Sequence, residues 1–111
     1  MIDWERVLEL RDEIGLEDFQ EIVDLFLTEV EHAIDEMRKG PENPTLRTEQ
    51  MHFLKGAALN LGFRDLSQIC QAGETAAAIG DLNAVTVGQI SLMYNASKSD
   101  FLSLLPSKLA A

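Results

Sequence analysis

Apolar residues recur along most of this chain every three or four positions, the spacing of one face of an α-helix. The clearest run covers residues 17–38, where acidic residues separate the apolar ones. Its apolar positions are Phe19, Ile22, Val23, Phe26, Val30, Ala33, Ile34 and Met37. Residues 40–44, Gly-Pro-Glu-Asn-Pro, end the run because glycine and proline interrupt helices. We therefore expect a long amphipathic helix over 17–38.

Two further helices are predicted on either side of this one. The N-terminal segment predicts a short helix over 4–12, with Asp3 as its N-cap and an end near Gly15. After the proline-rich break, Thr45 can cap a helix that runs to Leu61. The short connection after Leu61 favours antiparallel packing of this helix and the one that follows.

The C-terminal half predicts two more helices. Gly62 closes the preceding helix, and Asp65 can cap the next one, which ends at Gly80. Its apolar positions are Leu66, Ile69, Cys70, Gly73, Ala76, Ala77 and Ile79. A last helix is expected over 83–104, before Pro106. Its apolar positions are Val87, Ile90, Met93 or Tyr94, Phe101, Leu104 and Leu105. Since no strand pattern appears, the sequence predicts an all-α protein, an antiparallel four-helix bundle with a short N-terminal helix.

Length and charge restrict the class of protein. The 111 residues, 46% of them hydrophobic, suffice for a single domain over 1–111. No run approaches the roughly 18 apolar residues that cross a bilayer, and the N-terminus is charged, so we expect a cytoplasmic protein. The net charge of −10 argues against nucleic acid or an anionic membrane as partner. We therefore expect a monomer that binds other proteins. The lone Cys70 is expected to be a small core residue.

One stripe of the 45–61 helix carries unusual chemistry. At about 100° per residue, Lys55, Gly56 and Leu59 all lie within roughly 60° of His52. The opposite side carries Gln50, Leu54, Ala57, Ala58 and Leu61. This pattern predicts that His52 is displayed on the surface. Glycine inside a helix costs about 1 kcal/mol relative to alanine, so Gly56 suggests the close approach of another molecule.

The sequence His-x-x-Lys-Gly at 52–56, followed by small residues and by Gly62, resembles the histidine-containing phosphotransfer (HPt) domain of two-component phosphorelays. The resemblance implies that His52 accepts a phosphoryl group from an aspartate of a receiver domain or from a kinase and passes it to another receiver. The implied partners are response-regulator receiver domains and a sensor histidine kinase. It further implies a carrier without kinase activity, cofactor or metal site of its own, since the receiver supplies the metal ion.

The residues around His52 suggest how such a site works. Lys55 favours the neutral imidazole by like-charge repulsion and can pair with phosphoryl oxygens, whereas Glu49 favours the protonated ring. The sequence leaves the balance between these two effects open. Folding the hairpin about Gly62 brings the region of Glu74 opposite His52. The resemblance implies that Glu74 hydrogen-bonds the imidazole, which fixes its tautomer.

The same stripe is a candidate docking surface. Phe53, Gly56 and Leu59 are expected to contact the partner, although Phe53 fits core packing nearly as well. Many HPt domains have a serine after the lysine-glycine pair, where this chain has Ala57, so a hydroxyl contact to the phosphoryl group is absent at that position.

Two other functions fit parts of the sequence. Glu-x-x-His occurs twice, at 29–32 and 49–52, and di-metal carboxylate bundles use this spacing. Such a site needs both motifs to point into the bundle, whereas His32 and His52 both lie far from the apolar face of their helices. A helical adaptor that binds proteins without phosphotransfer is the other alternative. The chain could also be a piece of a larger protein, since chemotaxis kinases carry a similar N-terminal domain.

Overall fold

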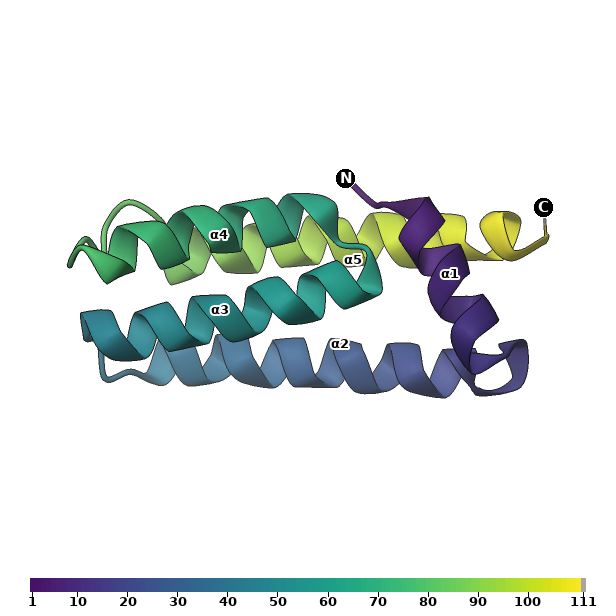
Figure 1. Ribbon diagram of the computed structural model, residues 1–111, viewed down its shortest axis with the longest axis horizontal. Coiled ribbons are helices and arrows are strands. Elements are labelled where there is room, and N and C mark those ends of the chain that lie inside the picture. The colour runs from purple at the N-terminus through teal and green to yellow at the C-terminus, as the bar shows by residue number, and fades with distance from the viewer. Residues whose placement is uncertain (111) are drawn as a thin grey trace.

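Four antiparallel helices form a bundle, and a shorter N-terminal helix crosses one end of it (Figure 1). The computed structural model describes residues 1–110, and within them no strand is present. The helices are α1 (Trp4–Ile14), α2 (Leu16–Lys39), α3 (Pro44–Leu61), α4 (Arg64–Ala78) and α5 (Val87–Ala110). The bundle is elongated, with extents of 45 × 20 × 20 Å. The expected all-α architecture is therefore confirmed.

The starts of α3 and α4 differ from those expected. Asn43, not Thr45, caps α3, and its side chain accepts a 2.8 Å hydrogen bond from the backbone N–H of the third helical residue. Pro44 takes the first helical position, where its missing N–H costs nothing. Phe63 lies at the N-cap of α4, and Asp65 falls in the first turn. The connection after α3 is too short to place Asp65 before the helix.

The last helix is displaced toward the C-terminus relative to the expected range of 83–104. It begins at Val87, where Thr86 and Gln89 cap it reciprocally: each side-chain oxygen accepts a hydrogen bond from the other residue's backbone N–H. It continues through Pro106, which lies on the exposed side of the helix, to Ala110. Proline removes one backbone hydrogen bond and crowds the carbonyl four residues earlier, so the continuation of α5 past Pro106 was not expected from the sequence.

An aromatic cluster joins α1 to the bundle. The Trp4 ring stacks parallel on Phe101 with centroids 5.7 Å apart, and Phe63 packs between Phe101 and Tyr94 at 5.4 and 6.3 Å. The backbone N–H of Asp3 donates a 2.7 Å hydrogen bond to the carbonyl at the α3–α4 turn. These contacts place α1 across the end of the bundle where α3 turns into α4.

Two residues expected in the core are outside it. Ile79 is 84% exposed because α4 ends one residue earlier, so the position no longer follows the helical spacing. Leu104 is also exposed, since Phe101 and Leu105 form the buried face of α5 at that level.

Cys70 is fully buried as expected, and burial raises the pKa of its thiol to about 12. The thiol is therefore protonated and unreactive at neutral pH.

Candidate functional site

The imidazole of His52 projects from the middle of α3 and is 70% exposed. Its Nδ1 lies 3.0 Å from Oε1 of Glu74 on α4. An ionised carboxylate can only accept a hydrogen bond, so the contact places a proton on Nδ1. In the neutral ring, Nε2 is then the unprotonated nitrogen. The hairpin thus brings Glu74 opposite His52, as the sequence predicted.

Close packing of α3 against α4 makes this contact possible. Gly62 adopts φ +81° at the turn between the two helices, a backbone conformation that favours glycine. Further along, a β-carbon on Gly73 would lie 2.7 Å from Cε and 2.8 Å from Sδ of Met51. Met51 and Gly73 directly precede His52 and Glu74 in the sequence. Gly73 was predicted only as one position of the apolar face of its helix, although a glycine inside an amphipathic helix is a signal of such close packing.

Lys55 contacts two side chains of α4. Its Nζ forms an ion pair with Oε2 of Glu74 at 2.8 Å and donates a 3.0 Å hydrogen bond to Oε1 of Gln71. Both Lys55 and Glu74 are about one-fifth exposed. Lys55 and His52 therefore bind the same carboxylate, Lys55 at Oε2 and His52 at Oε1 of Glu74.

Electrostatics at this cluster favour an ionised Glu74. The Lys55 ammonium, and to a smaller extent the His52 hydrogen bond, hold the pKa of the Glu74 carboxyl below its usual 4.5, although burial opposes the shift. Gln71, which the sequence analysis missed, is held in turn by a 3.1 Å hydrogen bond from its amide to the Thr75 hydroxyl. It lies one helical turn before Glu74, and this i, i+3 spacing is the signal that could have found it.

The other side of the imidazole is largely apolar. A pocket of about 310 Å³ lies between α2 and α3 and is lined by Phe26, Glu29, His52, Phe53, Gly56, Ala57 and Asn60. Phe53 is half exposed, and a β-carbon on Gly56 would meet nothing within 4 Å. Leu59, also half exposed, does not line this pocket. His52 thus has a charged side toward α4 and an apolar side toward α2.

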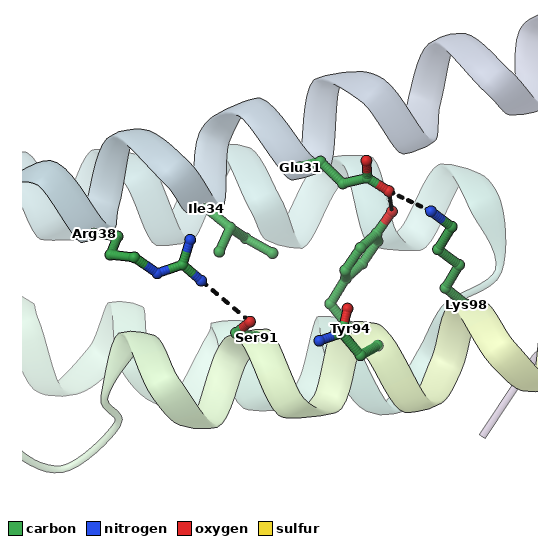
Figure 2. Close-up of a pocket in the computed structure, with 7 residues that line it drawn as sticks. Glu31, Ile34, Arg38, Ser91, Tyr94 and Lys98 are labelled. Atoms are coloured by element: carbon green, nitrogen blue, oxygen red, sulfur yellow. Dashed lines mark hydrogen bonds and ion pairs between the residues drawn. The ribbon is translucent and has the colours of Figure 1, made fainter.

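A second pocket, of about 360 Å³, lies between α2 and α5 (Figure 2). There the Tyr94 hydroxyl donates to Glu31, and Lys98 donates to the same carboxylate oxygen at 2.7 Å. These two contacts hold the pKa of Glu31 below its usual range. Arg38 donates a 3.3 Å hydrogen bond to the Ser91 hydroxyl. These contacts bind polar groups of α2 to polar groups of α5, and we assign them the structural role of joining the two helices.

His32 lies on the outer surface of α2. It is 74% exposed, and its Nε2 is 3.9 Å from Glu36. Because both His32 and His52 project outward, they do not meet the inward orientation that a di-metal bundle requires. Within residues 1–110, no cluster of three or more histidine, cysteine or acidic side chains is placed to hold a metal ion. The described helices likewise include none with the length and apolar character needed to span a membrane.

A family model described as the Hpt domain matches residues 21–100, a range that includes the His52–Glu74 pair. The chain therefore belongs to the Hpt domain family, whose members are helical bundles that carry phosphoryl groups in two-component signalling. Members of this family interact with histidine kinases and response regulators, and they are phosphocarriers and not kinases. Comparison with curated proteins and with solved structures gave no match.

Proposed function

We propose that this protein carries a phosphoryl group on Nε2 of His52, receiving it from a kinase or a receiver aspartate and passing it to a response-regulator aspartate. One observation carries the proposal. Nδ1 of an exposed imidazole is held by the Glu74 carboxylate at 3.0 Å, which leaves Nε2 as the nucleophile.

The transfer step follows from this arrangement. When a phosphorylated receiver docks, the Nε2 lone pair attacks phosphorus, and the N–P bond forms as the O–P bond to the aspartate breaks. The electron pair of that bond leaves with the aspartate carboxylate. The proton stays on Nδ1, where the negative charge of Glu74 offsets the positive charge that develops on the ring. The same steps in reverse deliver the phosphoryl group to the next aspartate.

Lys55 and the apolar side of His52 have separate roles in this proposal. The Lys55 ammonium stabilises negative charge on the phosphoryl oxygens during transfer. The receiver docks over the α2–α3 side, on a surface that includes Phe53, Gly56 and Leu59, because this side combines apolar side chains with open space at Gly56. We also propose that the chain acts as one domain and as a monomer.

Phosphorylation assays on histidine variants test the function. The protein is incubated with a receiver domain labelled by acetyl phosphate, and the parent is compared with His52→Gln and with His32→Gln as the matched control. We expect an acid-labile, base-stable label in the parent and in His32→Gln, and none in His52→Gln. The ³¹P NMR signal should be that of the Nε2 isomer. A label that persists in His52→Gln would refute the assignment.

The adaptor alternative gives a different result in the same experiment. An adaptor would bind the receiver in a pull-down or by calorimetry, yet the receiver would keep its label. The His52–Glu74 geometry favours transfer, because simple binding does not require a ring nitrogen held in one tautomer.

A further inference from the structure

We propose that Gln71 is a positioning residue that holds the Lys55 ammonium on the α4 side of the site and so limits how strongly this lysine stabilises phosphorylated His52. The inference rests on the proposed function, since it concerns the phosphorylated state of the same histidine. It assigns a role to a residue that neither touches the imidazole nor lies on its helix.

Three contacts carry the proposal. The Lys55 ammonium donates to Oε1 of Gln71 at 3.0 Å and pairs with Glu74 at 2.8 Å. The amide of Gln71 is oriented by its own 3.1 Å hydrogen bond to Thr75, which keeps the carbonyl oxygen turned toward the lysine. Among residues 1–110, Lys55 forms no hydrogen bond to His52. The ammonium is therefore occupied on α4 while His52 is unphosphorylated.

Phosphorylation introduces a competitor for this ammonium. A phosphoryl group on Nε2 brings two negative charges and three strong acceptor oxygens within reach of a lysine one turn away. In this state Nδ1–H keeps Oε1 of Glu74, and the ion pair of Lys55 with Oε2 is stronger than its hydrogen bond to the neutral amide of Gln71. The bond that Lys55 gives up to reach the phosphoryl group is therefore the one to Gln71. Gln71 thus weakens the phosphorylated form relative to a site with a free lysine. A weaker phosphorylated form suits a carrier, because it releases the group to the next aspartate more readily.

Replacement of Gln71 by leucine tests this competition. Gln71→Leu keeps a side chain of similar size with good helix propensity and removes only the acceptor. At equilibrium with a phosphorylated receiver, we expect the ratio of phosphorylated to free His52 to rise about threefold or more, the size of one modest hydrogen bond. Gln68→Leu is the matched control, because Gln68 is an exposed glutamine one turn earlier on α4. It should leave the ratio unchanged.

A double-mutant cycle shows whether Gln71 acts through Lys55. In a Lys55→Met background, Gln71→Leu should have no further effect on the phosphorylated fraction. An independent reading comes from the unphosphorylated protein, where ¹⁵N relaxation of the Lys55 ammonium should report greater mobility in Gln71→Leu than in the parent. This reading does not depend on phosphotransfer.

The outcomes separate the two proposals. A parent protein that acquires no label on His52 refutes the proposed function, and the ammonium mobility then decides the Gln71–Lys55 contact by itself. A parent that is phosphorylated, with an equilibrium identical to that of Gln71→Leu, overturns the role of Gln71 and leaves the function standing. An effect of Gln71→Leu that persists without Lys55 also overturns it.

Discussion

Met51 and Gly73 pack against each other between α3 and α4, one residue before His52 and Glu74 respectively. The contact is so close that a β-carbon on Gly73 would lie 2.7 Å from the Met51 methyl group. Met51 is fully buried, so its side chain has little room to move aside. This packing lies one residue away from the pair that forms the 3.0 Å hydrogen bond between His52 and Glu74.

Replacement of Gly73 by alanine should therefore disturb the site. We expect Gly73→Ala to lower the free energy of unfolding by about 1–3 kcal/mol, the usual cost of overpacking, although alanine favours helices. Phosphotransfer to His52 should slow as Glu74 moves away. Thermal denaturation and transfer from a labelled receiver measure the two effects.

The control for this prediction is Gly88→Ala on α5. A β-carbon there has only one ordinary contact, at 3.8 Å from the Thr86 hydroxyl, so this variant should keep or slightly raise its stability and keep its transfer rate. A second variant, Gly73→Ala with Met51→Ala, removes the clash and should recover transfer despite a less stable core. Normal transfer in Gly73→Ala alone would contradict the spacing argument.

The features of the site that depend on the helical repeat of apolar residues were predicted from the sequence. The helical pattern placed His52 on the outer surface, and the hairpin turn at Gly62 placed Glu74 opposite it. The orientation of Lys55 was beyond such reasoning, because it depends on which acceptors the neighbouring helix presents and at what distance. The predicted end of α5 was wrong because Pro106 was expected to stop the helix, whereas the helix continues past this exposed proline to Ala110.

Removal of the Lys55 charge should affect both transfer and stability. Lys55→Met retains most of the aliphatic chain and leaves Glu74 without its ion-pair partner. We expect transfer to His52 to slow about tenfold, as for loss of one charged contact in the transition state. The free energy of unfolding should fall by about 1–3 kcal/mol, because the Glu74 carboxylate is only one-fifth exposed and loses its ion-pair partner. Rapid-quench assays and denaturant titration give both values, and an unchanged transfer rate would exclude the role of Lys55.

The lowered pKa of Glu74 predicts a pH dependence of stability. A carboxyl whose pKa is lower in the folded state stabilises the fold fully above its unfolded value, near 4.5, and loses this contribution as the pH falls through the folded value. Glu74→Gln cannot ionise and lacks the effect. We therefore expect the parent to be more stable than Glu74→Gln at neutral pH and the difference to shrink below pH 4.5. Urea titrations across this pH range measure it, and a difference that is independent of pH would contradict the prediction.

Gly56 gives the test in which structural and functional roles predict different results for the same substitution. A β-carbon added at Gly56 would meet nothing within 4 Å, so Gly56→Ala and Gly56→Gln should fold normally and gain up to about 1 kcal/mol in helix stability. If the receiver docks across this position, however, a glutamine side chain obstructs the aspartate, which must reach about 3–3.5 Å from the attacking nitrogen. We expect transfer to fall at least about tenfold in Gly56→Gln, with Gly56→Ala intermediate, because a 1 Å misplacement costs on the order of a hundredfold. Gly88→Gln serves as the control for a new glutamine on a distant helix. Unchanged transfer in a folded Gly56→Gln protein would mean that the receiver does not approach over the α2–α3 side of His52.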